Sequence, residues 1–111
     1  MINVEINHAP DGKIQSFTMS GHAEFADAGQ DIVCAGASAV SFGAVNAIEE
    51  LTGVEPGIEM GGEGGYLKCI LPDGLDAGTS DKIQLILSTM LVSLKTIERD
   101  YKEYMKIIIH K

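Results

Sequence analysis

Hydrophobic and polar residues alternate at the start of the chain. Every second residue from Ile2 to Ile6 is apolar, which is the period of a strand with one buried face. Residues 10–13 read Pro-Asp-Gly-Lys, and this sequence favours a turn that folds the chain back. Residues 14–22 follow as a second strand. The pattern therefore predicts an N-terminal hairpin, with His22 at or just past its end.

Two later segments have the period of amphipathic helices. Asp31 is placed to cap the first helix, over residues 31–52, and Gly53 is a natural stop after it. A second helix is predicted over residues 80–100. The first apolar stripe consists of Val33, Ala37, Val40, Ala44, Ile48 and Leu51, and the second of Ile83, Ile86, Leu87, Met90, Leu91, Leu94 and Ile97.

The remaining segments favour strands. Two short strands, around residues 58–60 and 67–71, are joined by the glycine-rich residues 61–65, and the isoleucines near the C-terminus favour a last strand. Residues 61–65 are typical of a hairpin connection. They lack the Lys, the Ser or Thr and the following helix of a phosphate-binding loop. The order β-β-α-β-β-α-β predicts one α+β domain, residues 1–111. We expect a two-layer sandwich of an antiparallel or mixed sheet and two long helices.

Composition limits the partners. The net charge of −8 disfavours nucleic acid, whose binding depends on Lys and Arg, and it suits a basic protein. The first residues lack the pattern of a signal peptide. No apolar run is expected to reach the ~18 residues that span a membrane. We therefore expect a cytoplasmic protein with both thiols, Cys34 and Cys69, reduced.

The candidate chemistry lies between His22 and Ser38. Cys34 falls in the first turn of the predicted helix, where free backbone N–H groups stabilise a thiolate. A nearby His22 is a possible base for such a nucleophile. Asp31 is placed to cap the helix, to orient His22, or to do both. Ser38 lies one helical turn after Cys34 on the same face.

Simpler interpretations of the same residues stay open. Cys34 is also typical of a small buried apolar residue, His22 of a polar strand end, and Asp31 of a cap alone. A metal site built from these residues, with His8 or His110, lacks the usual ligand spacing. We expect neither a metal nor a cofactor.

The motifs "SGHA" and "GQDIVCAGASAV" resemble those of the ribosomal-processing cysteine protease family, the Prp group. The resemblance extends over nearly the whole chain, with Gly36 as one small departure. It implies that Cys34 is the nucleophile and His22 the general base, with Asp31, Ser38 and Gly21 at supporting positions. It also implies a mobile substrate loop formed by Ala23, Glu24, Phe25, Ala26, Asp27, Ala28, Gly29 and Gln30.

The resemblance further implies a function. Family members remove an N-terminal extension from a basic protein of the large ribosomal subunit, and they are homodimers. The acidic composition suits such a substrate. The N-terminus of the first helix offers backbone N–H groups that are expected to stabilise an oxyanion near Cys34.

Two alternatives of other kinds remain. The chain is also compatible with a non-catalytic module that binds a basic ribosomal protein or an assembly factor, with Cys34 merely packed. A hydrolase of small acyl or amide substrates would use the same two residues in a closed pocket.

Overall fold

The structure, a computed structural model, describes residues 1–27, 29–61 and 65–111. The predicted element order and the α+β class are confirmed. The second helix begins at Ala77, earlier than predicted, because the side chain of Asp76 caps it by accepting the Thr79 N–H. The elements are β1 Ile2–His8, β2 Ile14–Ser20, α1 Ile32–Thr52, β3 Gly57–Met60, β4 Tyr66–Ile70, α2 Ala77–Asp100 and β5 Met105–His110.

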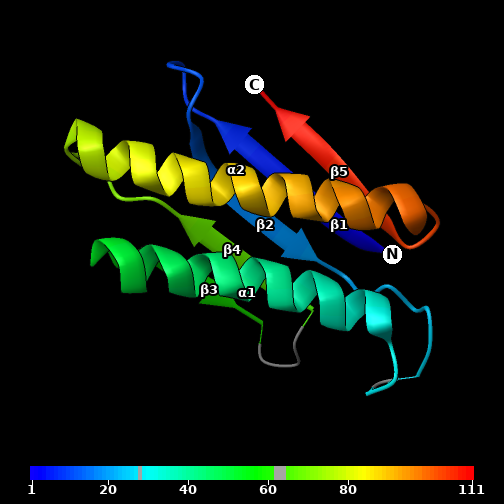
Figure 1. The fold of residues 1–111 in the computed structure, drawn as a ribbon. Helices are drawn as coiled ribbons and strands as arrows, with labels where there is room; N and C mark the ends of the chain where they lie inside the picture. The colour runs from blue at the N-terminus through cyan, green and yellow to red at the C-terminus, as the bar shows by residue number, and fades with distance from the viewer. Residues whose placement is uncertain (28, 62–64) are drawn as a thin grey trace.

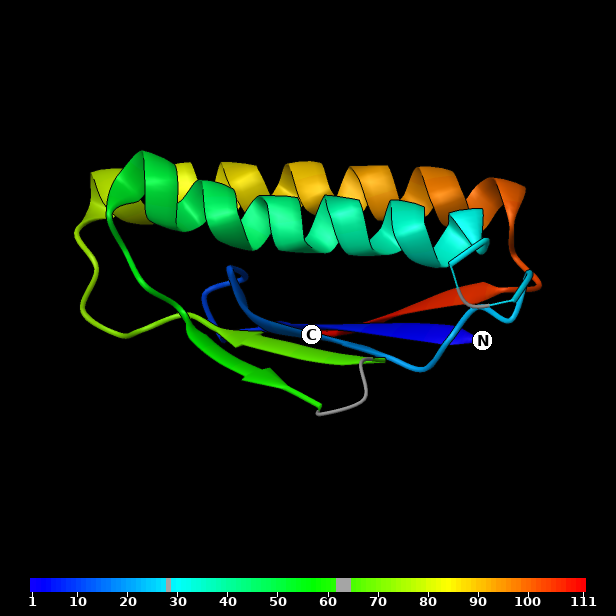
Figure 2. The same ribbon diagram turned by 90° about the horizontal axis from the view of Figure 1, so that it is seen from below.

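The five strands form one mixed sheet in the order β3-β4-β2-β1-β5. All neighbouring strands are antiparallel except β1 and β5, which are parallel. Both helices lie on the same face of the sheet, so the molecule has two layers (Figures 1 and 2). The end of β2 and the start of α1 meet at one end of these layers, and the chain between them is the predicted substrate loop.

The core lies between the sheet and the two helices. The alternating residues of β1 and β2 point into it, and the stripes of α1 and α2 cover them. Its largest fully buried side chains include Ile6, Phe17, Ile48, Leu67, Ile83, Leu87 and Leu94. The prediction for Leu51 is wrong, since this side chain is 69% exposed. The last turn of α1 extends past the start of β3, and the sheet no longer lies beneath it (Figure 2).

The composition of α1 corrects the expectation that no apolar run is long enough to span a membrane. By length and hydropathy alone, this helix is apolar enough to cross a membrane. One face of α1 packs in the core, however, with Ala37 and Ser41 fully buried. The Ser41 hydroxyl contacts the sulfur of Met19 on β2 at 3.4 Å. The core helix of a folded domain passes the same test of length and hydropathy.

Candidate active site

Two glycines determine where the His22 side chain lies. Gly21 follows β2 with φ = +87° and donates its N–H to the carbonyl of Gly65 at 2.7 Å. A Cβ on Gly21 would overlap the carbonyl oxygen of Met1, and a Cβ on Gly65 would lie 2.6 Å from His22 Nε2. Only glycine combines the positive φ with this close approach. The imidazole therefore rests against the backbone of Gly65.

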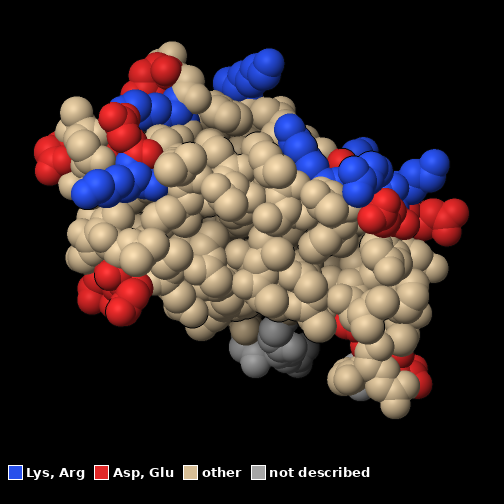
Figure 3. Space-filling view, viewed as in Figure 1, with Lys and Arg blue, Asp and Glu red and all other residues tan. Residues whose placement is uncertain are grey.

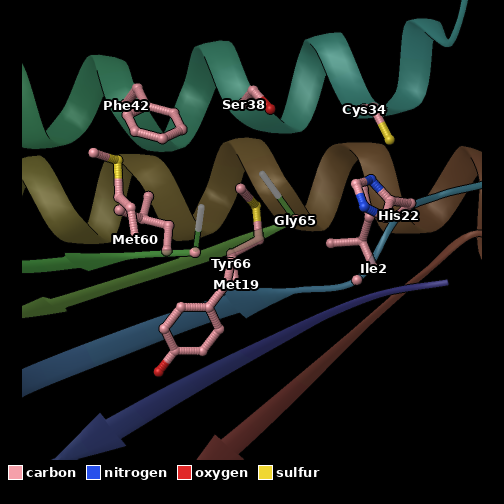
Figure 4. A pocket seen from close by; sticks show the side chains of 12 residues that line it. Ile2, Met19, His22, Cys34, Ser38, Phe42, Met60, Gly65 and Tyr66 are labelled. Carbon is pink, nitrogen blue, oxygen red and sulfur yellow. The ribbon is translucent and has the colours of Figure 1, made fainter. Parts of the chain in front are cut away.

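Cys34 faces the same segment from α1. It is the third residue of the helix and is half-buried. Its Sγ accepts the backbone N–H of Ala23 at 3.2 Å. Figure 4 shows Cys34 projecting from α1 toward the segment that carries His22. The thiol and the imidazole thus come from elements at opposite ends of the loop and line the same cavity.

Asp31 joins the loop to the helix. Its Oδ1 accepts the N–H groups of Val33 and Cys34, both at 3.0 Å. Its Oδ2 accepts the N–H groups of Phe25 at 3.0 Å and Ala26 at 3.4 Å. Asp31 therefore caps the helix and holds the loop, and within the described residues its carboxylate makes no hydrogen bond to His22.

The same contacts bear on the predicted oxyanion site. The N–H groups of Val33 and Cys34 are bound by the Asp31 side chain, and the N–H of Ala35 donates to the Asp31 carbonyl at 3.0 Å. These three groups are therefore already bonded to Asp31, and the oxyanion role of the helix start stays a prediction.

The hydrogen bond from the Cys34 backbone is the main reason that the pKa of Asp31 lies below its ordinary value of 3.8. Burial opposes this effect, while the bonds from Phe25 and Ala26 add to it. A carboxylate whose pKa is lower in the folded state stabilises that state above its unfolded pKa. This contribution to the stability of the folded state is lost as the pH falls from 3.8 through the lowered pKa of Asp31. The loop and the helix start are thus joined at neutral pH.

Cys34, His22 and Ser38 line two adjacent cavities. The first, of about 260 Å³, is mainly apolar (Figure 4). The second, of about 610 Å³, is formed by the loop and by Asp31. The apolar side chains of the first cavity are Ile2, Met19, Phe42, Met60, Tyr66 and Leu67. The sulfur therefore lies where the two cavities meet.

The structure brings most of the predicted site residues together. Gly21 lines the first cavity, and Glu24, Ala26 and Gly29 line the second. Ala23 contacts the sulfur. Ala28 lies outside the described residues, as do residues 62–64 of the predicted hairpin connection. The backbone carbonyl of Asp27 accepts the Gln30 N–H at 2.9 Å in a turn, and neither residue is among those that line the cavities.

Sequence reasoning missed the apolar lining. Phe42, Met60 and Tyr66 are large apolar residues that are partly exposed. Phe42 lies off the buried stripe of α1, and Met60 and Tyr66 flank the glycine-rich segment. Their position outside every buried stripe is the sequence signal that could have revealed the apolar lining. Among the residues that the structure describes, no group of three or more His, Cys, Asp or Glu side chains is arranged to hold a metal ion.

A two-layer α+β fold with a half-buried thiol and an imidazole on one cavity has the two groups that a cysteine hydrolase needs. The family model "Cysteine protease Prp" matches residues 1–106. The chain belongs to this family and is a cysteine protease. The resemblance seen in the sequence is confirmed, and the non-catalytic binding module is excluded.

Relatives and solved structures agree. The chain is 50% identical to the ribosomal processing cysteine protease Prp of Bacillus subtilis over 107 residues, which is 96% of each protein. Prp of Staphylococcus aureus, in complex with a covalently linked product peptide, has a TM-score of 0.90 at 46% identity; the match covers 98% of this chain and 99% of that one. Its complex with a substrate peptide has a TM-score of 0.84 at 45% identity, with the same coverage.

The first prediction concerns the two oxygens of Asp31. Asp31→Asn retains an oxygen that caps α1, but its amide nitrogen cannot accept the loop N–H groups. We expect amide exchange at Phe25 and Ala26 to quicken by about tenfold or more, since a bond to a charged acceptor contributes about 1.5–3 kcal/mol. Val33 and Cys34 stay protected. The measurement is hydrogen exchange followed by NMR.

The matched control is Asp76→Asn at the N-cap of α2, which should leave exchange in the loop unchanged. If Asp31→Asn also left Phe25 and Ala26 fully protected, the carboxylate would not be what holds the loop.

Proposed function

We propose that this protein removes an N-terminal extension from a basic protein of the large ribosomal subunit, with Cys34 as nucleophile and His22 as general base. The observation that carries the proposal is that Cys34 and His22 line the same two cavities. The names of the relatives, ribosomal processing cysteine proteases, support the substrate class. The peptide complexes of the Staphylococcus aureus protein support a peptide substrate.

Acylation begins when His22 takes the Cys34 proton and the sulfur adds to the scissile carbonyl carbon. A C–S bond forms, and the π electrons of the carbonyl move onto its oxygen. When the C=O bond re-forms, the C–N bond breaks, and the imidazolium gives its proton to the leaving amine.

Deacylation returns the enzyme to its starting state. Water gives a proton to His22 and adds to the thioester carbon. The C–S bond then breaks, the carboxylic acid leaves, and the sulfur regains its proton from the imidazolium.

The two cavities favour a particular substrate. The apolar cavity fits a large apolar side chain beside the cleaved bond. Residues 14–67, which hold Cys34 and His22, contain eight Asp or Glu residues and no Lys or Arg. The formal net charge of −8 therefore resides entirely in this segment, and it attracts a basic substrate. We propose that the two proteins meet in the cytoplasm and that the enzyme binds the protein chain rather than nucleic acid.

The second prediction tests the two catalytic residues. Cys34→Ala should lower cleavage of a peptide that spans the extension at least ~10³-fold, because the nucleophile is lost. His22→Ala should lower it by about 10²- to 10⁴-fold, the usual contribution of a general base. Cleavage is measured by mass spectrometry of the products.

Cys69→Ala, which removes the other thiol, is the control and should retain cleavage. Retained activity in Cys34→Ala would overturn the assignment of the nucleophile. A loss of only a few-fold in His22→Ala would remove His22 as the base. If the ribosomal protein of the same organism carries no extension, the proposed substrate is wrong.

The third prediction compares the two thiols. Cys69 is 1% exposed, and burial raises the pKa of its thiol to about 11. Iodoacetamide near neutral pH should therefore label Cys34 and leave Cys69 unmodified, as read by peptide mass mapping. His22→Ala should slow the labelling of Cys34 because the imidazole favours the thiolate. Equal inertness of both thiols would contradict an activated Cys34.

We also propose that the protein is a homodimer and that the outer face of the two helices is the interface. Neither residues 32–48 of α1 nor residues 83–94 of α2 include a charged residue. In Figure 3 the charged side chains of this face lie at its margins. Leu85 and Val92 are 70% and 64% exposed there. A face with no charge to attract an oppositely charged partner suits a second copy of itself.

The fourth prediction tests this interface. The wild-type chain should have twice its 11.8 kDa mass by light scattering, whereas Leu85→Glu should be monomeric because it places a charge in the apolar face. Lys82→Glu, on the same helix but in its charged part, should remain dimeric. A monomeric wild-type chain would contradict the proposal.

A further inference from the structure

The proposed reaction at Cys34 needs a hydrogen-bond donor for an oxyanion. A thiolate that adds to a carbonyl leaves negative charge on oxygen, and proteases stabilise it with fixed N–H groups. On α1, the N–H groups of Val33, Cys34 and Ala35 are already bonded to Asp31. An N–H that faces the Cys34 sulfur itself is therefore a better candidate than these three groups.

We propose that the backbone N–H of Ala23 is the oxyanion donor. It is 3.2 Å from Cys34 Sγ, so it already points at the reacting atom. Ala23 is 2% exposed, so water competes little for its N–H. This inference rests on the proposed function, because it takes Cys34 as the nucleophile.

The same N–H can serve both stages of the addition. Before attack it donates to the sulfur, where the negative charge lies. When the C–S bond forms, the charge moves to the carbonyl oxygen, which is one tetrahedral carbon away from the sulfur. A donor beside the sulfur is then within reach of the oxygen, and its hydrogen bond moves from sulfur to oxygen as the charge does. When the C–N bond breaks, the C=O bond re-forms and the charge on oxygen is lost.

Two contacts fix the position of this N–H. On one side, Gly21 binds Gly65 and sets the direction of residues 22 and 23. On the other side, the Phe25 ring packs edge-on against Tyr101, with ring centres 5.6 Å apart, and against Tyr104 at 5.1 Å. Between them Glu24 has φ = +58°, a conformation that costs a non-glycine residue free energy. The outer contacts must therefore hold Ala23 in place.

Tyr101 and Tyr104 are thus positioning residues. They lie at the turn between α2 and β5, where the Tyr104 N–H donates to the Tyr101 carbonyl at 2.8 Å. Neither lines the two cavities at Cys34. Their rings act on the reaction through Phe25, which holds the loop and, with it, the N–H of Ala23.

The fifth prediction removes this single N–H. Alanine at position 23 is replaced by lactic acid through nonsense suppression, which exchanges the N–H for an ester oxygen and keeps the side chain. We expect kcat for the extension peptide to fall about 10²- to 10³-fold, the usual effect of losing one oxyanion donor, with KM changed less than threefold. The rate of alkylation by iodoacetamide should fall far less, because alkylation forms no oxyanion.

The matched control is the same replacement at Ala9, whose N–H donates to the Lys13 carbonyl in the distant β1–β2 turn at 2.8 Å. It should leave kcat unchanged. The inference is overturned if the ester at position 23 leaves kcat unchanged. It is also overturned if kcat and the alkylation rate fall by the same factor, since the N–H would then act only on the thiolate.

The tyrosine rings give a second arm to the test. Tyr104→Leu removes the ring that packs on Phe25 and should lower kcat at least tenfold with little change in KM. Tyr104→Phe keeps the ring and should restore kcat. Equal kcat values for Tyr104→Leu and Tyr104→Phe would contradict the positioning role. These outcomes are separate from the proposed function, which fails instead if Cys34→Ala still cleaves the peptide.

Discussion

The split hydrogen bonding of the Asp31 carboxylate is the interaction on which the site depends. One oxygen satisfies the first free N–H groups of α1, and the other holds the loop that begins at the end of β2. A helix start and a strand end have no local reason to meet. The carboxylate brings them together at the point where Cys34 and Ala23 touch. The hydrogen bond from the Cys34 backbone is the main reason that the pKa of Asp31 is lowered, and those from Phe25 and Ala26 add to it, so the carboxylate still joins the two segments at neutral pH.

Much of the fold could be predicted because burial leaves a period in the sequence. Alternation in β1 and the stripes of α1 and α2 report which face meets the core. The pattern does not predict the exposure of Leu51, where the layers end. Nor does it predict the first residue of α2, which the capping side chain of Asp76 determines. That Cys34 and His22 lie at one site could be predicted from residue type and motif. Phe25 could not, since its partners Tyr101 and Tyr104 are far away in the chain and a lone aromatic residue in a loop has no periodic signal.

The cap at α1 also has an electrostatic consequence. A helix start usually offers positive partial charge to a cysteine in its first turn. Here the Asp31 carboxylate binds the same N–H groups and places a negative charge beside them. The hydrogen bond that the Cys34 sulfur accepts comes from outside α1, from the N–H of Ala23. His22 is the preceding residue, so a single backbone direction, set by Gly21 and Gly65, places the imidazole in the cavity and the N–H of Ala23 at the sulfur.

Under the proposed mechanism, the reaction depends on whether residues 22 and 23 are in place. The close packing at Gly21 and Gly65 holds the start of their segment, and Asp31 and the Phe25 ring hold its end. Residues of the loop line the second cavity, which Cys34 also lines. Under the proposed function, substrate binding in this cavity and the placement of His22 and Ala23 involve the same few backbone atoms. Peptides that fit the loop poorly would leave the nucleophile without its partners, and selectivity would then appear in the chemical step as well as in binding.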